Sequence, residues 1–258
     1  MMKGRQMATI VRDASSDPES SVSDPFPPPA FSLQPLQPRQ ARYRISDAVY
    51  EQLSDAIRSL RLPPGAPVSE PGIAAWFQVS RSPVREAFTR LVDLGLIVIV
   101  PQVGSHIAPI ALHEVEESVF IRCALESSAF QRAIETGAPD TTEIQRLVDE
   151  NVAAFETQDL EVFFDTDERL HQNVFALAGI PRLWQVVRGA KLQLDRLRQL
   201  NLSAAIENPE LIIEHQQIVD ALRDSDEAAG LAVIEKHSTR ILDDTVRLRA
   251  AHPTFFTA

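Results

Sequence analysis

The sequence contains little cysteine, no long apolar run and too few basic residues to balance its acidic ones, and each shortage excludes a class of protein. The single cysteine, Cys123, excludes an internal disulfide framework and fits a reducing cytoplasm. No apolar run approaches the roughly 18 residues of a membrane-spanning helix, and a Pro- and Ser-rich start stands in place of a signal peptide. We therefore expect a cytoplasmic protein with no membrane partner.

The acidic residues are concentrated in the C-terminal part of the chain. The net charge of the 258 residues is -11. Residues 42–110 contain 7 basic and 6 acidic residues, whereas residues 111–258 contain 14 basic and 26 acidic ones. An acidic surface repels phosphate, so any contact with nucleic acid is expected in the N-terminal half. With 44% hydrophobic residues, the chain is long enough for two compact domains with separate cores.

Residues 1–41 are rich in proline and polar residues and have few apolar partners. A segment of this composition cannot bury enough apolar surface to form a core. The pattern predicts a disordered leader, which is either a dispensable extension or a functional tail.

Residues 42–110 begin with helical periodicity and end with strand periodicity. Ser46 can cap a first helix and Ser69 a second, with a proline-glycine break between them. A third helix follows, and two β-branched segments at 96–100 and 106–108 then flank a turn. Three helices followed by a hairpin predict a winged helix-turn-helix. The alternative is a small α+β domain that does not bind DNA.

The start of the third helix carries four polar side chains, Ser80, Arg81, Ser82 and Arg85. The apolar residues of this helix repeat on its other side, which leaves both arginines near the N-terminal end of the polar face. Either serine can cap the helix. Arginine can fork onto guanine edges or phosphates, and hydroxyls can bind phosphate oxygens. This pattern is typical of a helix whose tip enters the major groove of double-stranded DNA.

Residues 46–110 resemble the GntR family of bacterial transcription regulators. The resemblance is carried by Pro64-Gly65, Ser69-Glu70, the run from Val79 to Ala87, Gly95-Leu96, and Pro101-Gln102 with Gly104. It implies that Ser80 and both arginines contact DNA, and that the turn Gln102–Gly104 is a wing that reaches the minor groove. Many members have arginine where this chain has Pro71 and Val103, so we expect a DNA contact to be missing at each of these positions.

Residues 111–253 show helical periodicity throughout and no strand pattern. Helix-breaking residues interrupt the pattern at five places, 137–139, 158–159, 179–181, 202–208 and 225–226. The breaks leave six helices of about 15–25 residues each. This part is therefore predicted to be an all-α six-helix bundle, followed by a short tail at 254–258.

Three of these helices carry a histidine or an aspartate in the middle of an apolar stripe. Asp167 and His171 are four residues apart on the third helix of the bundle, so they occupy one face. His215 and His237 interrupt the stripes of the fifth and sixth helices. Buried separately, each would need its own hydrogen-bond partner, whereas one divalent cation could satisfy all four. The pattern favours a metal site over four independent core residues.

Residues 112–253 resemble the FCD domain, the all-helical ligand-binding domain of the FadR subgroup of GntR regulators, and six helices indicate its VanR-like branch. The resemblance is carried by Asp167-Glu168-Arg169-Leu170-His171, Glu214-His215 with Ala221-Leu222, Lys236-His237, and the segment Leu248–Pro253. It implies that the aspartate and the three histidines hold a divalent metal, zinc first, with nickel, manganese or iron as alternatives. It also implies that a small organic acid binds at or beside the metal and that the domain forms a homodimer.

Arg122 and Glu126 interrupt the apolar seam of the first bundle helix. They can form a partly buried ion pair one turn apart. Alternatively, Glu126 orients Arg122 so that its guanidinium fork receives the carboxylate of an effector, which makes Arg122 the candidate effector-binding residue. Arg196 and Arg198 are weaker candidates, because one of them is expected to be a solvated surface charge.

Three functions are compatible with these features. The first, which we adopt, is a transcription regulator that binds a palindromic operator as a homodimer and responds to a small organic acid bound near the metal. The second is a metalloenzyme, because an open coordination position can activate water. No general base is evident beside the site, however, and an enzyme would leave the winged helix unexplained, so we expect no catalytic residues. The third is a regulator whose metal is purely structural or is itself the signal.

Overall fold

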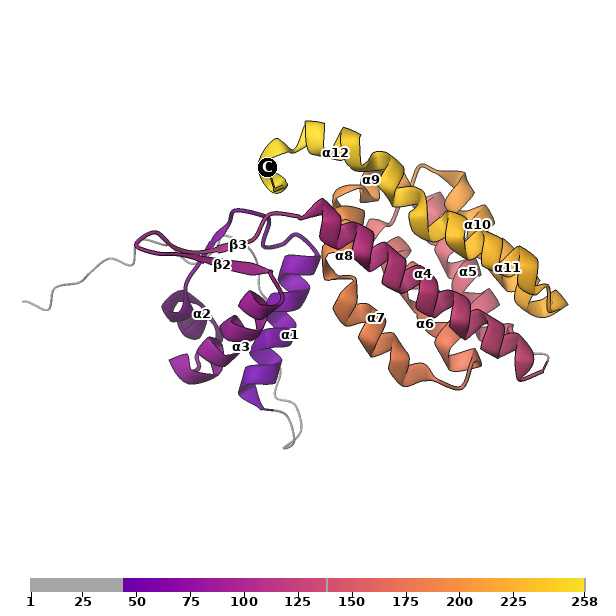
Figure 1. Ribbon diagram of the computed structural model, residues 1–258, viewed down its shortest axis with the longest axis horizontal. Coiled ribbons are helices and arrows are strands. Elements are labelled where there is room, and N and C mark those ends of the chain that lie inside the picture. The colour runs from indigo at the N-terminus through magenta and orange to yellow at the C-terminus, as the bar shows by residue number, and fades with distance from the viewer. Residues whose placement is uncertain (1–43, 138, 258) are drawn as a thin grey trace, which may run out of the picture.

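The computed structural model describes residues 44–137 and 139–257, so the predicted leader, residues 1–41, lies outside the described residues. A small N-terminal part and a larger helical part lie side by side and are joined by a short linker (Figure 1). Among the described helices, none combines the length and the apolar composition that crossing a membrane requires.

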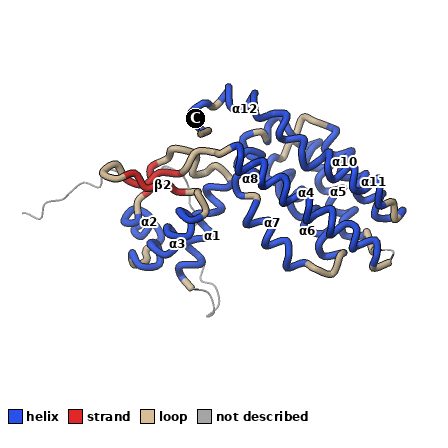
Figure 2. Tube along the Cα trace, in the orientation of Figure 1, coloured by secondary structure: helices blue, strands red, loops and turns tan. Residues whose placement is uncertain are grey.

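The N-terminal part contains three helices and a small sheet, α1 (Ile45–Arg58), β1 (Pro67–Val68), α2 (Glu70–Phe77), α3 (Arg81–Asp93), β2 (Ile97–Val100) and β3 (Gly104–Ile107). The strands are antiparallel in the order β1-β3-β2 and lie beside the three helices (Figure 2). Helices and sheet enclose one core, which includes Leu53, Ile73, Phe88 and Ile107. The predicted winged helix-turn-helix is present. Its additional strand, β1, is too short to give a strand pattern in the sequence.

The predicted helix caps of this part are only partly correct. Ser69 accepts a hydrogen bond from the Gly72 amide at 3.1 Å and caps α2 as predicted. The prediction for Ser46 is wrong, because Arg44 is at the N-cap position of α1 and Ser46 is buried in the first turn. Ser80 is at the N-cap position of α3, but its side chain makes no capping hydrogen bond. The Ser80 side chain therefore remains exposed at the tip of the helix.

The described residues of the C-terminal part form the helices α4 (Leu112–Glu135), α5 (Thr142–Thr157), α6 (Leu160–Leu177), α7 (Trp184–Ala190), α8 (Leu192–Leu200), α9 (Leu202–Ala205), α10 (Pro209–Asp224), α11 (Glu227–Thr239) and α12 (Thr245–Ala251). Four of the five predicted breaks lie between helices, whereas the predicted break at 202–208 is wrong in part, because the short helix α9 occupies its first half. The fourth predicted helix is also divided, at Lys191, and the sixth is divided by a 3-10 segment at Arg240–Asp244. Neither division contains a proline, so the periodicity of the sequence did not predict it.

The core of the bundle brings α4 and α11 very close together. Its largest side chains include Phe130 and Phe175. Gly230 of α11 faces the ring of Phe130, and a Cβ atom at position 230 would lie 2.0 Å from that ring. A larger residue would therefore force the two helices apart. Because α4 and α11 both carry candidate site residues, this contact limits the width of the site.

The linker between the two parts is held by the C-terminal part on two sides. Arg196 of α8 donates a hydrogen bond to the Ala108 carbonyl. The Ile110 amide donates to the Phe255 carbonyl at 2.7 Å, and the Thr257 amide donates to the Ile110 carbonyl at 3.0 Å. The last described residues of the chain, which the sequence predicts only as a short tail, thus pair with the linker.

Candidate metal centre and candidate DNA-contacting helix

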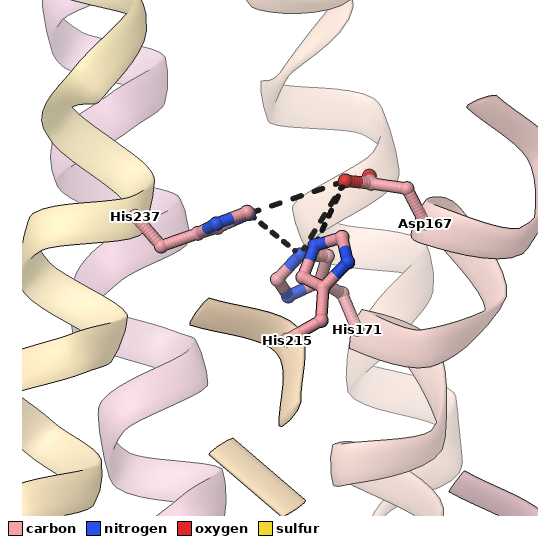
Figure 3. Close-up of side chains that lie close together, drawn as sticks. All are labelled: Asp167, His171, His215 and His237. Carbon is pink, nitrogen blue, oxygen red and sulfur yellow. Dashed lines mark hydrogen bonds and ion pairs between the residues drawn. The ribbon is translucent and has the colours of Figure 1, made fainter. Parts of the chain in front are cut away.

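The four candidate metal ligands meet in the middle of the helical bundle. Asp167 and His171 project from neighbouring turns of α6, His215 projects from α10, and His237 projects from α11 (Figure 3). All four side chains are buried, and one possible ligand atom from each lies within 4.8 Å of the others. Three helices that are distant in sequence therefore present polar side chains to one point in an apolar core.

The atoms that face one another are three imidazole nitrogens and one carboxylate oxygen. His215 Nε2 lies 3.3 Å from Asp167 Oδ1, and the Nε2 atoms of His171 and His237 lie 3.9 and 4.0 Å from the same oxygen. The Nε2 atoms of His171 and His237 are 3.1 Å apart. We refer to these four residues as the candidate metal centre.

The second ring nitrogen of each histidine contacts an oxygen that accepts hydrogen bonds. The pairs are His171 Nδ1 with Glu126 Oε2 at 2.9 Å, His237 Nδ1 with Glu214 Oε2 at 3.2 Å, and His215 Nδ1 with Asn151 Oδ1 at 3.0 Å. A carboxylate or amide oxygen cannot donate a proton, so each Nδ1 must carry it. Each Nε2 then presents a lone pair to the centre.

Burial keeps His171 and His237 neutral while the carboxylates beside them stay ionised. Burial lowers the pKa of His171, and it lowers the pKa of His237 to about 3. Burial opposes ionisation of Glu126, but the charge of Arg122 and the hydrogen bond from His171 hold the pKa of that carboxyl well below its usual range. The centre thus combines uncharged nitrogen donors with fixed negative charge behind them.

This set of donors fits a divalent cation. His215 Nε2 is buried and has no hydrogen-bond partner among the described residues. The Nε2 atoms of His171 and His237 are close enough for a hydrogen bond, but with both protons on Nδ1 they have none to share. A cation at the centre would satisfy these lone pairs and the charge of Asp167 together. Imidazole and carboxylate ligands suit zinc, nickel, manganese or iron.

Arg198 holds the second oxygen of Asp167. Its guanidinium donates to Asp167 Oδ2 and, at 2.6 Å, to Glu168 Oε1. Burial opposes ionisation of Asp167, but the Arg198 charge and the surrounding histidines hold the pKa of this carboxyl well below its usual range. The expectation that either Arg196 or Arg198 is a solvated surface charge is wrong. Arg196 is fully buried beside the linker, and the Arg198 side chain is only 14% exposed.

A line of buried ion pairs continues from this arginine to the N-terminal part. Lys191 Nζ lies 2.6 Å from Glu168 Oε2 and 2.7 Å from Asp195 Oδ1. Asp195 Oδ2 lies 3.7 Å from Arg58 Nη1 of α1. The guanidinium of Arg58 also lies 5.7 Å from the centre of the Phe164 ring, which Arg198 contacts at 4.8 Å. Charged groups thus connect the candidate metal centre with α1.

A cavity of 280 Å³ opens beside the candidate metal centre and is lined by Asp167, His237 and Arg122 among others. Arg122 is buried, and its Nε donates to Glu126 Oε1 at 2.8 Å, as the predicted ion pair requires. Its Nη2 atom is buried and has no hydrogen-bond partner among the described residues. The two interpretations of this pair are therefore compatible, because Glu126 holds one side of a guanidinium whose other side lines the cavity.

Two residues behind the histidines, Asn151 and Glu214, were not identified as site residues from the sequence. Asn151 is fully buried, and its amide nitrogen donates to the Phe163 carbonyl and to Thr166 Oγ1, both at 2.8 Å. These bonds fix the orientation of the amide whose oxygen accepts from His215. Glu214 is also held by Arg240. Both residues interrupt apolar stripes of their helices, and this was the signal that could have identified them.

The candidate DNA-contacting residues lie at two exposed places of the N-terminal part. Ser80, Arg81, Ser82 and Arg85 are exposed at the start of α3. Arg85 Nε is 3.2 Å from Glu70 Oε2 of α2, in an exposed pair that can open at little cost. In the turn between β2 and β3, Gln102 is exposed with φ 64° and Gly104 has φ 126°. The structure thus leaves both the helix tip and the wing accessible.

Comparison with known proteins assigns a family to this arrangement. Residues 45–107 match the family model of bacterial regulatory proteins of the gntR family, and residues 117–240 match that of the FCD domain. An uncharacterized HTH-type transcriptional regulator in an unstable DNA locus of Streptomyces ambofaciens is 32% identical over 81% of this chain and 88% of its own length. The HTH-type transcriptional repressor RspR of Escherichia coli K12 is 29% identical over 87% of this chain and 96% of its own length.

A solved structure supports the same fold. The structure of E. coli McbR/YncC superposes with a TM-score of 0.67 at 21% identity, over 81% of this chain and 99% of that one. The family models, the relatives and this fold agree with the two parts of the structure, and the relatives are regulators rather than enzymes. The chain therefore belongs to the gntR family of bacterial regulatory proteins and is a transcriptional regulator with an FCD domain.

Proposed function

We propose that this regulator binds a palindromic operator as a homodimer and that a small organic acid, bound beside a divalent metal ion, controls its affinity for DNA. The observation that carries the proposal is the convergence of Asp167, His171, His215 and His237 next to a cavity that Arg122 also lines. In this proposal residues 42–110 form the DNA-binding domain and residues 111–253 the metal-binding, effector-binding and dimerisation domain. Access to chromosomal DNA places the protein in the cytoplasm.

The DNA contacts would come from α3 and from the wing. Ser80, Arg81, Ser82 and Arg85 would enter the major groove, and the turn Gln102–Gly104 would approach the minor groove. The four α3 residues and Gln102 are exposed and Gly104 is half-buried, which supports the assignment. Because RspR is described as a repressor, we propose that the operator complex represses transcription.

The acid would bind between Arg122 and the metal. A bound cation would supply positive charge and open coordination positions for a carboxylate oxygen. Arg122 would donate from Nη2 to the same carboxylate, since its Nε is already held by Glu126. Aspartate and histidines keep the ion in place, and Glu126, Asn151 and Glu214 keep each imidazole in the required tautomer. The 280 Å³ cavity is near the lower end of ligand pockets, which favours a short acid.

The signal would reach the DNA-binding domain through the buried ion pairs. Arg198 touches both Asp167, in the candidate metal centre, and Glu168, the first member of the line that continues through Lys191 and Asp195 to α1. A ligand that draws Asp167 or Arg198 toward the cavity would therefore change the contacts made to α1. The acid-bound and acid-free proteins would then differ in these ion pairs, and therefore in the relative energy of two arrangements of the DNA-binding domain and the helical domain.

A screen of small carboxylic acids tests the proposal. The protein is freed of metal with a chelator, reloaded with zinc, and its melting temperature is measured with each acid, because a ligand that binds the native state raises its stability. We expect at least one acid to raise the melting temperature of the zinc-loaded protein and not that of the metal-free protein. If zinc binds but no acid does, the metal is structural or is itself the signal. If zinc does not bind, the four residues are ordinary core residues.

A further inference from the structure

Ser238 lies directly after His237 on α11 and lines the same cavity. It is only 1% exposed, and its hydroxyl has no hydrogen-bond partner among the described residues. A serine or threonine inside a helix usually donates to the carbonyl one turn earlier. The next residue, Thr239, does so, because its hydroxyl lies 2.8 Å from the Glu235 carbonyl. The Ser238 hydroxyl thus makes no bond to its own helix, and the residue that carries it is part of the cavity wall.

The other polar side chains around this cavity already have partners within the protein. Arg198 is paired with Asp167 and Glu168, Arg240 with Glu214, Asn201 with Asp244 and Arg247, and Asn208 with the Glu210 amide. Apart from the candidate metal centre itself, the two buried lining groups that have no partner among the described residues are the Arg122 Nη2 and the Ser238 hydroxyl. Leaving either group unpaired and buried is costly, so each is expected to bind something that enters the cavity.

We infer that Ser238 determines the chemical class of the effector, which is a short hydroxy acid rather than an unsubstituted acid. The inference rests on the proposed function. The carboxylate is taken by the metal ion and by Arg122, which is a cation and therefore prefers an anion. Ser238 is uncharged and can both donate and accept, so it matches a neutral hydroxyl of the ligand. The rest of this wall offers apolar contacts, including Phe163, Leu211 and Ile241.

The test compares ligands and variants that each differ by one hydroxyl. Succinate, malate and tartrate share one carbon skeleton and carry none, one and two hydroxyls, and lactate and propionate form a second pair. Dissociation constants are measured by calorimetry on the zinc-loaded full chain of the wild type, Ser238→Ala and Thr239→Val. Thr239→Val is the matched control, since it removes a neighbouring hydroxyl that is exposed and already bonded within the helix.

We expect the wild type to bind at least one hydroxy acid about tenfold more tightly than its deoxy partner, as one neutral hydrogen bond allows. Ser238→Ala should lose this preference by weakening the hydroxy acid alone, whereas Thr239→Val should keep it. Zinc content, measured for each protein, shows that the ion site is unchanged.

Three outcomes would overturn the inference. If Ser238→Ala weakens hydroxy and deoxy acids equally, or weakens neither, the hydroxyl is satisfied by water or by the carboxylate and does not select the ligand. If the wild type binds both members of each pair equally, the inference fails even where the variant does not fold. In these cases the proposed function stands. If zinc-loaded wild type binds no acid at all, the proposed function fails and the inference fails with it.

Discussion

At the tip of α3 the side chains of Ser80, Arg81, Ser82 and Arg85 are exposed, whereas every side chain of the candidate metal centre is buried. The exposed arginines have few partners in the protein, so their replacement should weaken DNA binding and leave the fold intact. Each buried histidine has a hydrogen-bond partner at Nδ1 and presents a lone pair at Nε2 that requires one. Their replacement should alter stability and ligand binding together.

The largest expected effect comes from the buried region. In His215→Ala and His237→Ala, loss of one ligand should remove most of the bound zinc and abolish any response to acid. The variants should also lose the stabilisation that zinc gives the wild type, about 2.7 kcal/mol at a hundredfold excess over Kd. Elemental analysis and thermal unfolding measure these changes. Operator binding without acid should survive, and full zinc content in both variants would contradict the metal assignment.

Replacements in the exposed region should weaken DNA binding and leave stability unchanged. Arg81→Ala and Arg85→Ala should each weaken operator binding by about 1–3 kcal/mol if the side chain contacts a base edge. If it contacts only phosphate, the loss should be equal for all sequences and the salt dependence should fall by about one charge. Fluorescence anisotropy on a duplex selected from a random pool measures the affinity and its salt dependence. Unchanged melting temperatures are part of the expectation, and wild-type affinity in both variants would exclude α3 as the DNA-contacting helix.

A residue that does not face the metal should still affect metal binding. Glu214→Gln removes the charge that His237 Nδ1 contacts, and such changes behind a ligand typically lower metal affinity about 10–100-fold. Competition with a chromogenic chelator measures the zinc affinity. Glu210→Gln, one turn earlier on α10 and exposed, is the matched control. Equal affinities of the two variants would show that the Glu214 carboxylate does not support the ligand.

The line of buried ion pairs should transmit the effect of acid binding from the candidate metal centre to the DNA-binding helices. Lys191→Met leaves Glu168 and Asp195 without their shared cation and should reduce the effect of acid on operator affinity by about 0.5–2 kcal/mol. The acid-binding constant itself should change little. The exposed Arg188→Met on α7 serves as control for the loss of one positive charge. If Lys191→Met responds to acid as the wild type does, the signal takes another route.

The smallest expected effect is the pH dependence of the metal-free protein. His237 has a pKa of about 3 in the native state, below its usual value of 6.5. The unfolded chain therefore takes up a proton as pH falls below 6.5 while the native state does not, so stability falls toward acid by at most about 1.4 kcal/mol per pH unit. Melting temperatures from pH 7 to pH 5 should show a weaker slope in His237→Leu. Equal slopes would mean that His237 is protonated in the native state.

The two regions also differ in how far the sequence predicted them. The four candidate ligands were found because each interrupts an apolar stripe, and the structure brings them together. The α3 tip was found because its polar residues precede such a stripe. Asn151 follows the same rule but was overlooked, since an amide is a less familiar site residue than a histidine.

The features that the sequence did not predict depend on tertiary contacts. Lys191 is at the division between α7 and α8, where no proline marks the break. Its buried charge is paired with Glu168 of α6 and Asp195 of α8. Either Arg196 or Arg198 was expected to be a surface charge, because the sequence does not show that Arg198 meets Asp167, which is 31 residues away. Periodicity identifies which face of a helix is buried, but it does not identify which charged groups meet across helices.

The most direct test of the account is a titration of the operator complex with an acid that binds in the thermal screen, carried out on zinc-loaded and on metal-free protein. We predict that the acid changes operator affinity at least several-fold in the zinc-loaded protein, as a typical coupling of 1–3 kcal/mol requires, and has no effect on the metal-free protein. An equal effect in both forms would contradict the central claim, because the acid would then act without the ion that Asp167 and the three histidines are proposed to hold.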